Sequence, residues 1–256
     1  MSLRPLRAGA PAERAGRRVA GLSGLPVQFA LVALAALAYF GVRGITQSSY
    51  EAAEANARDL VALQDVFGVS VEGSIQGAVL GHDWLVTLAN WIYIYGHWPL
   101  IVATMVILYL RVPAQFRTLR NAMFASGAIG LVIFALYPVA PPRLIELDLV
   151  DTVTERSTSY RALQPPSLTN PYAALPSLHV GWNLLVGIVL WRATTNLAVR
   201  AFALAMPLLM AFAVVATANH YVIDVAAGAL VALAGLVIVR RLQEDRPDEI
   251  AVRAPR

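Results

Sequence analysis

The sequence contains no cysteine and no lysine. Without cysteine, the chain of 256 residues can form neither a disulfide framework nor a thiolate metal site. All twenty basic residues are arginine, and this excludes a lysine nucleophile or a lysine Schiff base. Charged residues are also scarce, at 14% of the chain, whereas 58% of the residues are hydrophobic and gather in runs long enough to cross a bilayer. The composition therefore predicts an integral membrane protein.

The hydrophobic runs predict an all-α fold, a polytopic membrane helical bundle with about six transmembrane helices. The expected spans are Leu25 to Val42, about Ile94 to Leu110, Ala122 to Tyr137, Val180 to Trp191, Ala198 to Thr217 and Tyr221 to Val239. Tyr50 to Phe67 differs, because apolar residues recur there at helical spacing among acidic and basic ones, which predicts an interfacial amphipathic helix. We expect a disordered basic tail over residues 1–20, a single membrane domain over 21–243 and a polar cytoplasmic tail over 244–256.

Two other divisions of the chain stay open. Ala36-Leu37-Ala38 has the form of a signal-peptidase site, so the first run could be a cleaved signal peptide, although a long basic region precedes it. Gly73 to Leu110 could also hold two crossings, which would invert every later span. His82-Asp83 in the middle of that stretch argues against the second division.

The arginines predict the orientation. Under the six-span division, fifteen arginines lie in the two tails and alternate loops and five lie on the opposite side, so both termini are expected in the cytoplasm of a plasma or inner membrane. All four histidines, His82, His97, His179 and His220, then fall at or near the outer side. The arginines cluster at helix ends rather than along one face, so they do not indicate a nucleic-acid partner. We expect an extracytoplasmic site.

Two histidine motifs lie where apolar runs begin, Leu175-Pro176-Ser177-Leu178-His179 and Asn219-His220-Tyr221-Val222-Ile223-Asp224. His220 and Asp224 are four residues apart, so on a helix they share a face and the carboxylate can orient the ring. Ser177 is the expected N-cap of the span at His179. The two helix N-termini are expected to offer free N–H groups to an anion.

A proline-rich connection of about forty residues joins the third and fourth spans and carries Arg143. Its prolines preclude a long helix, and a structured loop of this length is usually functional. An arginine fork suits phosphate oxygens, so a phosphate is the predicted ligand. One imidazole can accept a phosphoryl group while a second imidazole protonates the leaving oxygen.

Pro176-Ser177-Leu178-His179 and His220-Tyr221-Val222-Ile223-Asp224 resemble the second and third signature motifs of the type 2 phosphatidic acid phosphatase superfamily. With Tyr137-Pro138-Val139-Ala140-Pro141-Pro142-Arg143, the chain is similar to the branch related to inositol phosphorylceramide synthase, over roughly residues 90–240. The resemblance implies that His220 is a nucleophile forming a phosphohistidine, with Asp224 as its orienting carboxylate and His179 as the general acid. It also implies that Ser177 and Arg143 hold phosphate oxygens.

The chain departs from the superfamily pattern at three positions. Leu178 stands where the second motif usually has glycine, and Val214 stands where an arginine is expected six residues before the nucleophile. The lysine of the first motif cannot exist in this chain. Arg143 is the expected counterpart of the first motif, with Arg161 or His97 completing the phosphate site.

These patterns predict a membrane enzyme, a lipid phosphatase or phosphotransferase, and the resemblance implies that it is inositolphosphotransferase-like. It is expected to act at the outer leaflet on a lipid phosphate or phosphodiester, with no metal and no other cofactor. Two other classes stay open. A lipid-phosphate binding or transport protein would use the same anion site without chemistry. A histidine-based metal protein would use the histidines and Asp224 as ligands, although no paired spacing such as H-E-x-x-H occurs.

Overall fold

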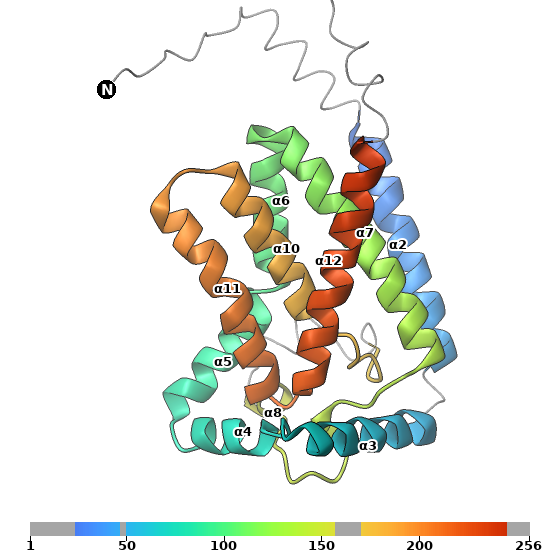
Figure 1. The fold of residues 1–256 in the computed structure, drawn as a ribbon, viewed down its shortest axis with the longest axis vertical. Coiled ribbons are helices and arrows are strands. Elements are labelled where there is room, and N and C mark those ends of the chain that lie inside the picture. Colours follow the sequence, from blue (N-terminus) through green and yellow to red (C-terminus); the bar gives the residue numbers. More distant parts are fainter. Residues whose placement is uncertain (1–23, 47–49, 157–169, 245–256) are drawn as a thin grey trace, which may run out of the picture. The chain divides into compact units, whose positions relative to one another are not determined.

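The computed structural model describes residues 24–46, 50–156 and 170–244. In this part of the chain, helices are joined by loops and one isolated β-bridge (Figure 1), so the predicted all-α class is confirmed there. The two predicted tails lie outside the described residues, apart from Glu244. The elements in chain order are α2 (Leu25–Thr46), α3 (Tyr50–Phe67), α4 (Glu72–Leu80), α5 (Asp83–Tyr95), α6 (Trp98–Arg111), α7 (Pro113–Leu136), η1 (Pro142–Leu144), α8 (Thr152–Arg156), α10 (Leu178–Ala193), α11 (Leu197–Ala216) and α12 (Val222–Glu244).

The chain divides after Gly41 into two units, and most of the helix α2 belongs to the first unit. Its 22 residues include the apolar stretch Pro26–Val42, which coincides with the first predicted span. The segment with the form of a signal-peptidase site lies inside this helix. The second unit begins at Val42 and contains every described residue of the predicted site.

Five of the six predicted spans coincide with helices, but the second, about Ile94 to Leu110, runs across the break between α5 and α6. Fewer of these helices are long enough to cross a membrane. Three helices, α7, α11 and α12, have the required length and apolar composition, and α5 with α6 forms a fourth candidate that is bent by 44°. The helix α10 has 16 residues and rises only about 24 Å, short of a hydrocarbon core of about 30 Å. The described residues therefore hold three helices, or up to four, that are long and apolar enough to cross, which indicates an integral membrane protein; the count of six remains a prediction.

The predicted amphipathic segment is a helix with the expected bounds, α3. Figure 1 shows α3 and α4 lying across the lower ends of α11 and α12. The buried face of α3 carries Ala53, Ala57 and Leu60, which pack with residues of the loop after α7 and with Tyr221. This face contacts protein, so α3 is part of the packed unit.

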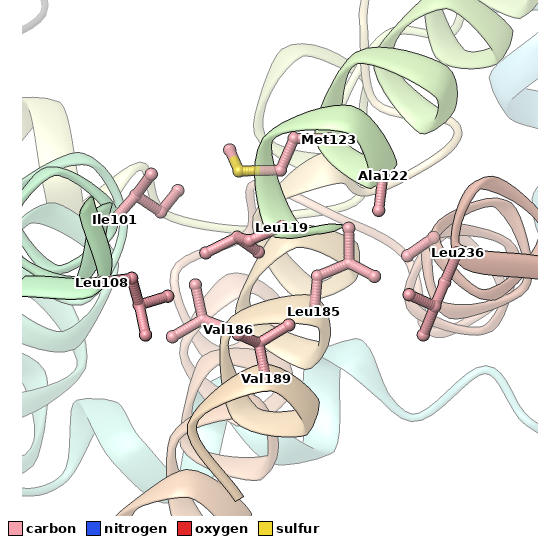
Figure 2. Packing of buried hydrophobic residues seen from close by; sticks show 10 residues of the cluster. Ile101, Leu108, Leu119, Ala122, Met123, Leu185, Val186, Val189 and Leu236 are labelled. Atoms are coloured by element: carbon pink, nitrogen blue, oxygen red, sulfur yellow. The ribbon is translucent and has the colours of Figure 1, made fainter. Parts of the chain in front are cut away.

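The hydrophobic core lies between α6, α7, α10 and α12 (Figure 2). It is built from Ile101, Leu108, Leu119, Ala122, Met123, Leu185, Val186, Val189, Ala232 and Leu236. The residues of α10 in this cluster, Leu185, Val186 and Val189, are each at most 1% exposed. Close packing of apolar side chains fixes α10 among its three neighbours.

Glycine allows α10 to approach α12 closely at the end that carries the histidine motifs. A Cβ atom on Gly228 would meet the backbone oxygen of Ser177, and one on Gly181 would meet the backbone oxygen of Gly228. The amide of Ser177 donates a hydrogen bond to the carbonyl oxygen of Asp224 at 3.0 Å. Only glycine permits this approach, which brings the start of α10 against the start of α12.

The proline-rich connection after α7 is tied to its surroundings by backbone hydrogen bonds. Val139 forms a parallel bridge with Ala173, which links the segment before Arg143 to the segment before Ser177. Asn56 of α3 donates from Nδ2 to the carbonyl oxygen of Pro138 at 2.8 Å. The short helices η1 and α8 are the only helical turns in the described part of this connection, consistent with the predicted effect of its prolines. Residues 157–169 lie outside the described part.

Candidate active site

His220 is buried in the turn between α11 and α12. Its Nδ1 is 2.8 Å from the carbonyl oxygen of Ala174 and 3.4 Å from Oδ2 of Asp224. Because a carbonyl oxygen can only accept a hydrogen bond, Nδ1 carries the proton in the neutral ring and Nε2 keeps its lone pair. The ring therefore presents Nε2 as a possible nucleophile.

The pair of His220 and Asp224 differs from the sequence-based expectation. His220 precedes α12 by two residues, so the two side chains do not share a helical face, and the carbonyl oxygen of Ala174 is closer to Nδ1 than the carboxylate is. Oδ2 of Asp224 instead accepts a hydrogen bond from the amide of Tyr221 at 2.8 Å. The tight turn before the helix causes this difference, and Asp224 still places a buried carboxylate behind the ring.

His179 lies in the first turn of α10, and its Nδ1 is 3.5 Å from Nε2 of His220. The two ring centroids are 5.6 Å apart in an edge-to-face arrangement. The Nε2 atom of His179 is buried and has no hydrogen-bond partner among the described residues. The two imidazoles thus converge from segments about forty residues apart, and together they can supply a nucleophile and a proton donor.

His97 lies at the break between α5 and α6, within a column of aromatic rings. Its ring centroid is 4.1 Å from that of His179 and 5.8 Å from that of Trp182, whose ring is nearly parallel. Tyr93 of α5 also stacks on His179, at 4.7 Å. Nδ1 of His97 is buried without a partner in the described part of the chain. The bend between α5 and α6 therefore brings this candidate phosphate ligand into contact with the general-acid candidate.

The N-terminus of α12 does not offer the free N–H groups that the sequence predicts. The amides of Tyr221, Val222 and Ile223 donate to side-chain oxygens of Asp224, Glu72 and Gln64, at 2.8, 2.8 and 2.9 Å. Two of these acceptors come from α3 and α4, which the sequence pattern gave no reason to place there. Of the two predicted anion-binding termini, only that of α10 begins with amides that have no acceptor among the described residues.

Ser177 occupies the predicted N-cap position of α10, but its side chain makes no capping hydrogen bond. The Oγ atom is fully buried and has no partner among the residues that the structure describes. A buried hydroxyl without a partner costs free energy, on the order of 1 to 3 kcal/mol. Such a group is expected where a ligand completes the hydrogen bonds, so Ser177 remains a candidate phosphate contact.

Arg143 lies in η1, and its side chain bridges two residues near the turn of His220. Nη1 donates to Oδ1 of Asn219 at 2.6 Å, and Nε pairs with Oδ2 of Asp151 at 3.0 Å. Its backbone amide donates to the carbonyl oxygen of Ala218 at 3.1 Å. The guanidinium is therefore held by the amide of Asn219, which directly precedes His220, and by the carboxylate of Asp151, with Nη2 unbonded among the described residues.

The sequence-based interpretation missed Asn219, Asp151, Tyr93, Trp182, Gln64 and Glu72 as neighbours of the site. Asn219 stands directly before the nucleophile candidate, so its position could have suggested a role. The others give no sequence signal, because they reach the site from separate segments. Arg161, a predicted phosphate contact, lies outside the described residues. No group of three histidine, cysteine or acidic side chains in the described segments is arranged to hold a metal ion.

Comparison with known proteins gives one family and one solved structure. The model of the PAP2 superfamily matches residues 58–238. The crystal structure of Aquifex aeolicus LpxE is similar to the chain with a TM-score of 0.53 and 15% identity, covering 67% of this chain and 93% of that one. At this identity the likeness shows the fold alone. No protein with a curated description matches the chain.

Proposed function

The chain belongs to the PAP2 superfamily, and on this basis we propose that it is a membrane lipid phosphatase or phosphotransferase that works through a phosphohistidine on His220. One observation carries the proposal. Nδ1 of His220 donates to the carbonyl oxygen of Ala174, which leaves the lone pair of Nε2 facing His179 at 3.5 Å. A fixed tautomer with a second imidazole beside the free nitrogen is what nucleophilic catalysis with a general acid requires.

In the proposed first step, Nε2 of His220 attacks phosphorus, and the bond from phosphorus to the leaving oxygen breaks as the N–P bond forms. Protonated His179 gives its proton to that oxygen. The carboxylate of Asp224 stabilises the positive charge on the phosphorylated ring. In the second step, water or an alcohol attacks phosphorus, neutral His179 takes its proton, and the N–P bond breaks.

Arg143, Ser177 and His97 are the proposed contacts of the phosphate oxygens. The guanidinium of Arg143 is preorganised by Asn219, and Oγ of Ser177 and Nδ1 of His97 are buried atoms without partners among the described residues. The amides that open α10 add donors on the same side. Arg161 stays a predicted contact.

The proposed substrate is a lipid phosphate or phosphodiester at the outer leaflet. The excess of arginines in the tails and alternate loops supports a site on the extracytoplasmic side with both termini in the cytoplasm. The segment from Tyr137 to Arg143 supports an inositolphosphotransferase-like branch, in which an alcohol replaces water as the acceptor. Hydrolysis and transfer use the same first step.

The test measures turnover by purified wild-type protein and by the His220→Ala and His179→Ala variants in mixed micelles. The substrates are phosphatidic acid, a sphingoid base phosphate and a polyprenyl phosphate, each with and without inositol as acceptor. We expect each variant to lose activity by about a thousandfold, because nucleophile and acid act as a unit. Full activity in either variant would contradict the mechanism.

Mass spectrometry after an alkaline quench separates an enzyme from a carrier. We expect one phosphoryl group on the peptide that contains His220. Binding of the lipid without any adduct and without turnover would favour a lipid-phosphate carrier. Loss of activity on addition of a chelator would favour the metal-protein alternative.

A further inference from the structure

The turn that follows the proposed nucleophile is held by side chains from distant parts of the chain. The amide of Val222 donates to Oε1 of Glu72 at 2.8 Å, and the amide of Ile223 donates to Oε1 of Gln64 at 2.9 Å. These partners are 150 and 159 residues away in sequence. Local capping would normally satisfy such amides, so the first turn of α12 depends on α3 and α4 for its hydrogen bonds.

Gln64 and Glu72 also brace each other. Nε2 of Gln64 donates to the same Oε1 of Glu72 that accepts from Val222, at 2.9 Å. Gln64 is fully buried and Glu72 is 6% exposed. Burying a carboxylate is costly unless hydrogen bonds and favourable charges compensate, and here the helix N-terminus supplies both. We call this pair of Gln64 and Glu72 the bracket. Its two side-chain oxygens accept hydrogen bonds from the backbone amides of two consecutive residues, Ile223 and Val222.

The bracket acts on the part of the chain that sets the position of His220. The side of the turn that precedes His220 is fixed by Asn219. The backbone amide of Asn219 donates to the carbonyl oxygen of Val214, and the side-chain Nδ2 of Asn219 donates to Oγ1 of Thr217. The side of the turn that follows His220 is fixed by the bracket, through the amides of Val222 and Ile223. A nucleophile must lie within tenths of an ångström of its productive position, and small displacements are expensive in rate.

We propose that Gln64 and Glu72 are positioning residues for His220, holding its turn through the amides of Val222 and Ile223. This proposal rests on the proposed function. Gln64 lies on the buried face of α3, so this face would position His220 as well as pack against the rest of the protein. It also explains why the start of α12 is closed to phosphate, since its amides already bind the bracket.

The experiment measures the affinity for orthovanadate, a phosphate analogue that can bind at a histidine nitrogen, from the rise it causes in the thermal unfolding midpoint. The variants are Glu72→Ala, Glu72→Gln, Gln64→Met and His220→Ala. We expect Glu72→Ala and Gln64→Met to weaken vanadate binding by about tenfold, because the turn loosens. Glu72→Gln keeps an acceptor oxygen and is expected to restore most of the affinity.

The control is Leu119→Ala, which removes a buried side chain from the core of Figure 2 without touching the turn. It is expected to lower the unfolding midpoint and to leave vanadate affinity unchanged. The proposal is overturned if Gln64→Met and Glu72→Ala bind vanadate as the wild type does while His220→Ala does not. It is also overturned if Glu72→Gln is as weak as Glu72→Ala. If Glu72→Ala does not fold, Gln64→Met decides alone.

A failure of the proposed function gives a different result. In that case wild-type protein would not bind vanadate, or His220→Ala would bind it as well as the wild type does. Either outcome removes the premise on which the positioning of His220 depends, whatever the bracket variants do.

Discussion

The two ends of α10 and α12 differ in what they bury: apolar side chains at one end and polar atoms at the other. Around Leu185 and Leu236, apolar side chains fill the space between helices (Figure 2). At the other end, the same two helices surround buried polar atoms that have no partner in the described residues, among them Oγ of Ser177, Nε2 of His179 and Oδ1 of Asp224. Most buried polar atoms in folded proteins are paired, so unpaired ones gathered in one place indicate a ligand site.

The difference suggests how stability and function are divided in this protein. Apolar packing at one end fixes the helices, and the glycine contacts hold them close at the other end, where hydrogen-bonding capacity is left unused. Substitutions at the first end should change stability more than activity, and substitutions at the second end should do the reverse.

Asp224→Asn should give the largest effect. Removing the negative charge behind His220 is expected to lower kcat by about a thousandfold, or about 4 kcal/mol of transition-state stabilisation. The unfolding midpoint should stay the same or rise, because a buried carboxylate with an unpartnered oxygen is lost. Lipid phosphate turnover and thermal unfolding in detergent measure the two quantities. If Asp224→Asn unfolds more easily yet keeps its kcat, the end of the helices that carries Asp224 contributes to stability rather than to activity.

Leu185→Ala is expected to give the opposite result. The side chain is fully buried in the core, so its loss should lower the free energy of unfolding by about 3 kcal/mol. The kcat of the folded protein should stay within about twofold, because a packing defect far from the turn leaves the reacting groups in place. Leu208→Ala is the matched control, since this leucine is 72% exposed and should change neither quantity. A large loss of kcat in Leu185→Ala would mean that the core also sets the site.

Arg143→Lys should weaken phosphate binding. Lysine cannot reproduce the two bonds from Nε to Asp151 and from Nη1 to Asn219, so KM and the inhibition constant of inorganic phosphate should rise by about tenfold, or about 1.4 kcal/mol. Arg58→Lys is the control, because Arg58 pairs with Glu54 on an exposed helical face. If Arg143→Lys leaves KM and the inhibition constant as unchanged as Arg58→Lys does, then the positive charge of Arg143 is sufficient and its two fixed hydrogen bonds are not required.

Ala218→Gly should give the smallest effect. Ala218 has a φ of 55°, a left-handed conformation that costs a residue with a Cβ about 1 kcal/mol. Glycine removes this strain but adds freedom to the unfolded chain, so a gain of about 0.5 kcal/mol in unfolding free energy is expected. Ala216→Gly, at the end of α11, should instead lower the unfolding free energy by about 0.5 to 1 kcal/mol. Equal losses in the two variants would refute the strain at Ala218.

Much of the fold could be predicted because local pattern controls it. Apolar residues at helical spacing over Tyr50 to Phe67 predicted the bounds of α3, and hydropathy located the other long helices. The break at Gly96 and His97 was missed, because the run from Trp84 to Leu110 is continuous in hydropathy. At this break a Cβ on Gly96 would meet the backbone oxygen of Ile92 and then the Cε atom of Met206 on α11, so the close turn favours glycine.

The candidate site was predictable only in its sequence-local part. The motifs that hold His179, His220 and Asp224 could be read from the chain, whereas the ring column of Tyr93, His97 and Trp182 could not. Stacking depends on where α5, α6 and α10 meet, and no periodicity encodes that. The prediction that α12 begins with free N–H groups was wrong for the same reason. The side chains that accept from the amides of Val222 and Ile223 come from α4 and α3.

Local pattern along the chain was enough to predict which segments are helical and apolar, and to locate the two histidine motifs. These properties depend on neighbours a few residues apart, whose side chains share a helical face or a run of hydropathy. The protonated nitrogen of His220, the caps on the first amides of α12 and the side chains around the imidazoles depend instead on the packed fold. Those features require contacts between residues as far apart as 159 positions, and such contacts exist only after packing has brought the helices together.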